Sequence, residues 1–175
     1  AKQRISGLLA VPALVLILAL FASLWVNPIA AAGWAELVIV AHIGVVLLCR
    51  RFEAEERSKF NAPRSTASFV IAEAVYGICW SMLALFTLVA EPGTALLVAM
   101  FTMTLIGIAS NAVSTRTLPA ATLTSTLPPA ATVCISLVLS GGTLNWALAA
   151  VVVGGELFFV FLAKQLYKSE LGNIE

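Results

Sequence analysis

Three ionisable side chains, His42, Glu73 and Glu156, stand inside long apolar runs of this sequence. A charged group at the centre of a lipid bilayer costs about 3 kcal/mol on insertion scales, so such groups usually face a protein interior, pair or stay neutral. The two glutamates could be protonated, or hydrogen-bonded to His42, to Tyr76 or to a hydroxyl side chain. Two interpretations stay open: a ligand pocket or protonatable sensor in a helical bundle, and interhelical hydrogen bonds that only fix packing.

An aromatic residue and a pair of prolines extend this candidate site. Trp80 lies within an apolar run rather than at its end. Pro128 and Pro129 lie midway along another run, where proline removes a helical hydrogen bond and favours a kink or a broken helix. Neighbouring hydroxyls can satisfy the freed carbonyls. Broken helices mark binding sites in some transporters, and a static kink is the simpler alternative. The predicted ligand-binding or sensing residues are therefore His42, Glu73, Tyr76, Trp80, Pro128 and Glu156.

The chemistry that the sequence lacks limits the classes of function. A single histidine cannot give bis-histidine haem ligation, and the chain has no HExxH, no GxSxG and no P-loop. Its three cysteines are widely spaced without a CxxC, and we interpret them as small hydrophobic residues. We predict no catalytic residue and no metal site, and the cofactor stays unknown. A net charge of +1 gives no reason to expect nucleic acid as a partner.

The composition indicates the surroundings that hold these groups. Of the 175 residues, 61% are hydrophobic and 11% are charged, and the mean hydropathy is +1.01. Soluble domains carry about 25% charged residues, and one of this size could not bury so much apolar surface. The sequence therefore predicts an integral membrane protein. Its fold class should be all-α, because lipid offers no partner for a free backbone N–H or C=O.

Apolar runs of about 20 residues, enough to cross about 30 Å of hydrocarbon, occur six times. The predicted spans are 5–25, 35–52, 66–89, 94–114, 120–139 and 144–167. A link with Asn27, Pro28 and Gly33 separates the first two, and residues 53–65 form a long polar loop. We predict a six-helix transmembrane domain over residues 1–168, and the start of a cytoplasmic linker helix over 169–175.

The positive charges predict the orientation. Six crossings place all ten Lys and Arg residues on one side of the membrane: Lys2, Arg4, Arg50, Arg51, Arg57, Lys59, Arg64, Arg116, Lys164 and Lys168. Five or seven crossings would scatter them over both sides. The positive-inside rule then puts both termini in the cytoplasm. Trp25, Trp34 and Trp146 fall at the opposite rim, where indole rings prefer the lipid–water interface.

The last apolar run passes without a proline into a basic stretch, so its helix should leave the membrane and continue. Tyr167, Leu171 and Ile174 follow at spacings of four and three, as in a heptad seam. We therefore expect the chain to be the membrane part of a longer receptor. Gly154 and Gly155 would allow close helix contact, either within the bundle or at a homodimer face.

The layout of residues 50–170 resembles the six-helix membrane input region of bacterial signalling proteins. These are diguanylate cyclases and phosphodiesterases with GGDEF or EAL domains, and some sensor histidine kinases. The resemblance lies in a basic loop from Arg50 to Arg64, the sequences YGICWS (76–81) and GIASNA (107–112), the prolines 119, 128 and 129, and the basic exit KQLYK (164–168). It implies a signal input in the bacterial cytoplasmic (inner) membrane, coupled to a cytoplasmic output.

The leading hypothesis is a sensory transmembrane module in the lipid bilayer, working as a homodimer. A small hydrophobic ligand is a candidate stimulus, and the output domain would follow in cis on the last helix. The alternative is a small proton- or cation-coupled transporter, in which Glu73 and Glu156 are ion sites and the span with Pro128 is the broken helix. An intramembrane enzyme is a third option that lacks paired catalytic groups.

Overall fold

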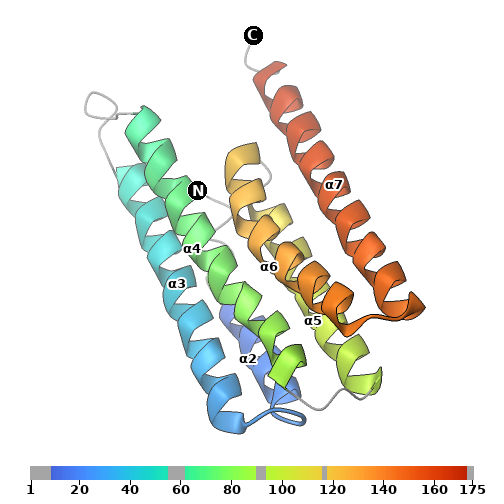
Figure 1. The fold of residues 1–175 in the computed structure, drawn as a ribbon. Coiled ribbons are helices and arrows are strands. Elements are labelled where there is room, and N and C mark those ends of the chain that lie inside the picture. Colours follow the sequence, from blue (N-terminus) through green and yellow to red (C-terminus); the bar gives the residue numbers. More distant parts are fainter. Residues whose placement is uncertain (1–8, 55–61, 90–93, 116–117, 173–175) are drawn as a thin grey trace.

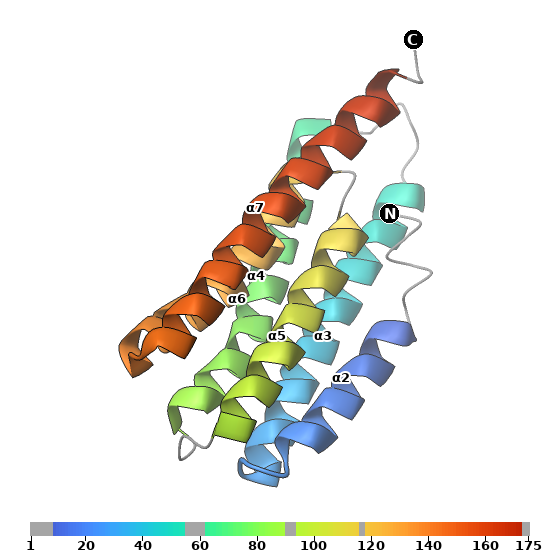
Figure 2. The same cartoon turned by 90° about the vertical axis from the view of Figure 1, so that its right-hand side faces the viewer.

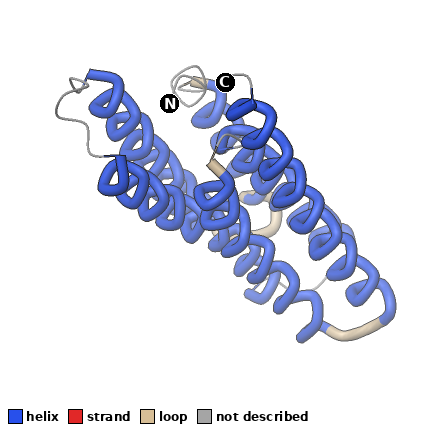
Figure 3. The backbone as a smooth tube through the Cα atoms, turned by 90° about the horizontal axis from the view of Figure 1, so that it is seen from above, coloured by secondary structure: helices blue, strands red, loops and turns tan. Residues whose placement is uncertain are grey.

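The computed structural model describes residues 9–54, 62–89, 94–115 and 118–172. These residues form helices and no strands, which confirms the all-α prediction. The helices are α2 (Ala10–Ala22), α3 (Pro28–Ala54), α4 (Ala62–Val89), α5 (Thr94–Thr115), α6 (Pro119–Ser140) and α7 (Thr143–Gly172). They run alternately up and down, side by side, as Figure 1 shows. Loops and turns are short wherever the described chain changes direction (Figure 3).

Four described helical segments are long and apolar enough to cross a membrane. They are Pro28–Ala54, Ser65–Phe86, Pro119–Ser140 and Thr143–Ser169. The described part of α2 is shorter, with 13 residues, and α5 has 22. Large aliphatic side chains such as Leu20 and Leu157 stay about 70% exposed, as expected where lipid, rather than water, is the solvent. The chain is thus built as a membrane protein.

Helices α4 and α6 lie at the centre of the bundle. Helix α4 packs against α3, α5 and α6, whereas α6 also packs against α7. Helix α2 lies at one edge on α3, and α7 lies at the other edge on α6 and α5, as Figures 1 and 2 show together. One buried cluster joins α2, α3 and α4 and includes Met103 of α5. A second joins α4 to α5, α6 and α7.

Helix α3 begins earlier than the sequence predicted. The expected link through Gly33 is wrong, because Pro28 already starts the helix. The side-chain oxygen of Asn27 accepts a hydrogen bond from the N–H of Ile29 at 2.8 Å, an N-cap followed by proline at the first helical position. The predicted 53–65 loop is shorter at both ends, since α3 reaches Ala54 and α4 starts at Ala62. Residues 55–61 lie outside the described part.

Helix α6 is continuous through Pro128 and Pro129, so the broken helix, one of the two alternatives for these prolines, is wrong. The described hydroxyl groups nearby do not bond the carbonyls that lose a donor to the two prolines. The Thr132 hydroxyl, for example, donates to the Pro128 carbonyl at 2.9 Å. Pro129 leaves the Ser125 carbonyl without its usual helical donor, and Gly77 of α4 lies against that carbonyl. A Cβ on Gly77 would stand 2.6 Å from the Ser125 oxygen. Close packing of α4 thus supports α6 where its own hydrogen bonding is weakest.

The described cations gather at one end of the bundle. Arg50 and Arg51 lie in the last turns of α3, and Lys164 and Lys168 lie in the last turns of α7. Both helices end at the same end of the bundle, the upper end in Figure 1. Arg64 lies in the first turn of α4, which starts there too. The other cations, Lys2, Arg4, Arg57, Lys59 and Arg116, lie outside the described residues.

Candidate functional site

Four of the predicted site residues lie in the interior between α3 and α4. His42, Glu73 and Tyr76 are fully buried, and Trp80 is 1% exposed. The rings of His42 and Tyr76 are 5.8 Å apart between centroids, and those of Tyr76 and Trp80 are 6.3 Å apart, edge to face. Glu73 lies three residues before Tyr76, on the same side of the helix. We call His42, Glu73, Tyr76 and Trp80 the α3–α4 cluster.

Trp34 belongs with this cluster, and its predicted place at the lipid–water interface is wrong. It is 1% exposed, its indole N–H donates to the Cys79 carbonyl at 3.1 Å, and its ring meets that of Trp80 edge to face at 5.7 Å. A periodic signal for this was present in the sequence. Residues 34, 38, 42, 45 and 49 share one face of a helix, and the structure buries all of them.

A glycine on α5 shapes the far side of the cluster. Gly107 lies against the six-membered ring of Trp80, so closely that a Cβ there would collide with the ring. The small-residue stretch of this helix therefore packs inside the chain at Gly107, because only glycine leaves room for the indole. The indole N–H of Trp80 has no hydrogen-bond partner among the described residues.

Asn111, one turn further along α5, is a buried polar residue that sequence reasoning did not select. It is fully buried, and neither its amide nitrogen nor its amide oxygen has a partner in the described part of the chain. An amide inside an apolar run is itself the signal for an interior polar position, and it lay within the GIASNA stretch. Asn111 thus adds a buried polar side chain on α5 to those of the α3–α4 cluster.

Glu156 lies elsewhere, between α7 and α6. The Thr126 hydroxyl is 2.6 Å from its Oε1 atom, so a hydroxyl side chain, one of the partners considered from the sequence, is the one that this carboxyl meets. The same hydroxyl is 2.8 Å from the Thr122 carbonyl. A hydroxyl carries one proton, so both contacts are hydrogen bonds at once only when the Glu156 carboxyl brings a proton of its own. Its Oε2 atom is buried and has no partner among the described residues.

The hydroxyl contacts continue from Thr126 along α6 towards α5. The Thr122 hydroxyl donates to the Thr115 carbonyl at 3.0 Å, and the two side-chain oxygens are 3.1 Å apart. Thr122, Ser125 and Thr126 are all fully buried. This polar seam joins α5, α6 and α7 without using an ion pair.

The structure therefore divides the six predicted residues between two places. The α3–α4 cluster takes His42, Glu73, Tyr76 and Trp80, whereas Glu156 pairs with α6, on the other side of α4. Pro128 is half-buried on α6, two residues after Thr126. Glu73 and Glu156 therefore do not share one pocket.

The Glu156–Thr126 contact predicts a coupled loss of stability. Thr126→Val and Glu156→Ala should each lower the free energy of unfolding, and the double variant should lose less than the sum. The expected coupling is about 1 kcal/mol, the size of interhelical hydrogen bonds in membrane proteins. Thr132→Val is the matched control, since its hydroxyl bonds only within α6. Unfolding in detergent measures all four; additive losses would contradict the contact.

Fold and interior together define an all-helical membrane protein with polar groups buried between its helices and no recognisable catalytic constellation in the described residues. Comparison with known proteins finds no matching family model, no matching curated protein and no matching solved structure. The function is therefore argued from this chain's own geometry.

Proposed function

We propose that this chain is a transmembrane signal-input module that relays a stimulus through α7 to a cytoplasmic output domain. The continuity of α7 carries the proposal. Its 30 residues run from Thr143 to Gly172 as one helix, about 45 Å at 1.5 Å per residue, whereas the hydrocarbon core is about 30 Å thick. A helix of this length passes a shift or rotation from the bundle to the aqueous side.

The packing of α7 fits a moving element. Only 17% of an 18-residue apolar stretch of α7 is buried inside the bundle, whereas 39–44% is buried in the other candidate spans. Its described interhelical hydrogen bonds are the Glu156–Thr126 contact and a long bond from the Cys134 thiol to the Ala149 carbonyl, 3.7 Å. A helix held by few contacts changes its packing at low cost, and protonation or ligand binding near Glu156 would bias the two arrangements.

In the proposed topology the chain crosses the bacterial inner membrane six times, and both termini lie in the cytoplasm. The described cations at one end of the bundle support it through the positive-inside rule. A homodimer through α7 is part of the proposal. Gly154 and Gly155 have no described neighbour within 4 Å of where a Cβ would stand, so the close approach they permit is unused among the described residues.

A phase test measures relay through α7 without knowing the stimulus. The chain is fused after Ser169 to a dimer-dependent diguanylate cyclase, with one to four alanines inserted at the junction. Because each residue rotates the helix by about 100°, the output should rise and fall with the insertion length and return near four residues. We expect the highest and lowest outputs to differ by about 5-fold or more, which is the effect of a typical allosteric coupling energy. Equal output at every length would overturn the proposal, as would equal output with a Gly-Ser junction.

The Glu156→Gln variant in the same fusion separates sensing from transport. A sensor should shift its output by a few-fold, because the amide keeps a permanent donor at Thr126, whereas the carboxyl can lose its proton. The proton-coupled transporter remains the alternative, although the continuous α6 removes the broken helix on which it depended. Proton flux in proteoliposomes, abolished in Glu156→Gln with unchanged output, would favour transport over signalling.

A further inference from the structure

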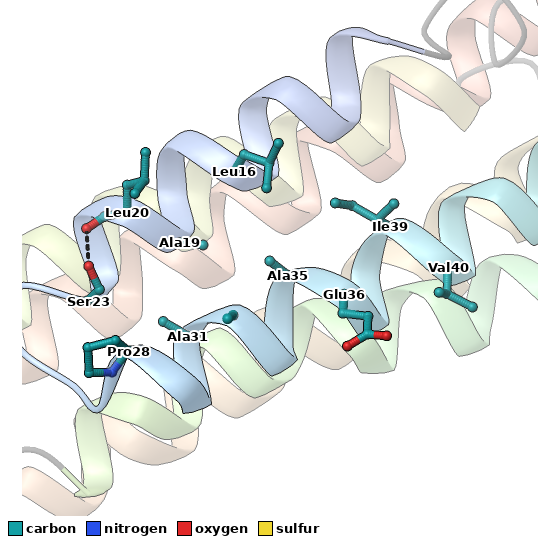
Figure 4. Close-up of a pocket in the computed structure, with 11 residues that line it drawn as sticks. Leu16, Ala19, Leu20, Ser23, Pro28, Ala31, Ala35, Glu36, Ile39 and Val40 are labelled. Atoms are coloured by element: carbon teal, nitrogen blue, oxygen red, sulfur yellow. Dashed lines mark hydrogen bonds between the residues drawn. The ribbon is translucent and has the colours of Figure 1, made fainter.

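A groove of about 610 Å³ opens on the outer face of the bundle between α2 and α3. Its volume lies in the range of small-molecule sites, about 300–1,000 Å³. Figure 4 shows the side chains that line it, from Ser23 and Pro28 at one end to Val40 at the other. It lies apart from the α3–α4 cluster and from Glu156, which do not line it.

Small residues open this groove. Ala19 of α2 faces Ala31 and Ala35 of α3, so the two backbones have little between them at this level. Leu16 and Leu20 extend from α2 and form one wall. Leu20 is 71% exposed and Leu16 53%. The result is an aliphatic trough suited to an extended hydrocarbon chain.

A carboxyl group borders the trough at membrane depth. Glu36 lies eight residues after Pro28, about 12 Å along the helix, within the hydrocarbon zone of a bilayer centred on α3. No described side chain forms an ion pair or hydrogen bond with it, and it is exposed. The sequence predicted that this span starts at residue 35, which would place Glu36 at the membrane surface rather than within the hydrocarbon. Ionisable groups at such a depth mark functional sites.

Both polar side chains of the groove offer acceptors. The Ser23 hydroxyl donates its hydrogen bond to the Leu20 carbonyl at 2.7 Å. Only the lone pairs of its oxygen therefore stay available to a ligand. Glu36 adds two carboxyl oxygens, and no lysine or arginine of the described residues lines the groove. A ligand that donates hydrogen bonds and carries positive charge complements these acceptors.

We propose that the α2–α3 groove binds a single-chain aliphatic amine, with its ammonium group at Glu36 and its hydrocarbon chain along the alanines. A phospholipid fits less well, since its phosphate would stand beside two acceptors and no cation. A second copy of this chain supplies no partner either. Its described cations lie at the far ends of α3 and α7 and at the start of α4, away from the depth of Glu36. The site does not depend on the signalling role.

The test uses the whole 175-residue chain in phosphatidylcholine nanodiscs that hold equal mole fractions of hexadecylamine and hexadecanol. Native mass spectrometry after release counts the amphiphile retained per protein. The amine should be retained about 10-fold over the alcohol, equivalent to about 1.4 kcal/mol. In Glu36→Gln this preference should disappear. In Glu53→Gln, the matched control at the exposed end of the same helix, it should persist.

Ala32→Leu, which fills the groove from its exposed side, should lower retention of both amphiphiles. Equal retention of amine and alcohol by the natural chain would overturn the proposal. So would an equal loss in Glu36→Gln and Glu53→Gln, because bulk charge would then explain the preference. Retention of phosphatidylcholine in place of the amine would assign the groove to lipid and also reject the proposal.

Discussion

Replacement of Gly77 by alanine should destabilise the bundle by about 1–3 kcal/mol, the usual cost of forcing extra atoms into a packed core. The added Cβ would stand 2.6 Å from the Ser125 carbonyl oxygen and 2.9 Å from the Ser125 Cα. Both are backbone atoms that cannot swing away, so α4 and α6 must separate. The substitution strains the most extensive helix–helix contact of the described bundle, that between α4 and α6. Thermal unfolding in detergent, followed by size exclusion, measures it.

Gly44→Ala is the matched control for this prediction. Gly44 lies on an exposed face of α3, and a Cβ there meets nothing within 4 Å. Alanine is the better helix former by up to about 1 kcal/mol, so this variant should be neutral or more stable. Opposite signs for the two glycines support the close approach of α4 to α6. A similar effect at both positions would contradict it.

Trp34→Ala should cost about 3–5 kcal/mol, the range for removing a large buried aromatic side chain. It removes the ring that packs edge to face on Trp80 and the N–H that donates to the Cys79 carbonyl. Trp34→Phe keeps a ring but loses the donor, so it should cost less, with about 1 kcal/mol from the hydrogen bond. The same unfolding assay in detergent measures both.

Trp146 provides the comparison for Trp34. It is 60% exposed at the start of α7, where an indole contributes to membrane anchoring rather than to the core. Trp146→Ala should therefore change the free energy of unfolding in detergent by no more than about 0.5 kcal/mol. A loss at Trp146 as large as that at Trp34 would show that the two residues have equivalent surroundings.

The buried polar groups explain how such a bundle holds a specific arrangement in lipid. Apolar contact alone distinguishes poorly between helix pairings there, because lipid tails are as apolar as leucine. Hydrogen bonds such as Thr126 to Glu156, and close fits such as Gly107 on Trp80, select one pairing. These are also the contacts that a proton or a ligand can change. The proposed signalling role depends on that property.

Several features were predictable from the sequence. The helical class followed from composition, and most helix ends fell within a few residues of the apolar runs, as at Val89 and Ser140. Hydropathy is a local quantity, so it marks where a helix lies along the chain. A polar residue inside a run also indicated burial, and His42, Glu73 and Glu156 are each at least half-buried.

Other features were mispredicted because a rule based on residue type was outweighed by capping or by packing. Pro28 was taken as part of a loop, although proline at the first position starts a helix when Asn27 caps it. A broken helix at Pro128 and Pro129 was one of two alternatives, but α6 is continuous there and Gly77 of α4 packs against it. Trp34 was assigned to the interface by residue type, whereas its position on the inner face of α3 places it in the core.

By itself the sequence determined the class of protein, the approximate helices and the presence of ionisable groups at membrane depth. Only the tertiary structure decided which groups meet: Glu156 with Thr126, Trp34 with Trp80, and Glu36 with the groove rather than the core. The reason is that helices in lipid are apolar on nearly every side, so hydrophobic periodicity, which reveals the inner face of a helix in a soluble protein, is weak here. The inner face is chosen instead by small residues and hydrogen bonds, whose partners lie far away in the chain.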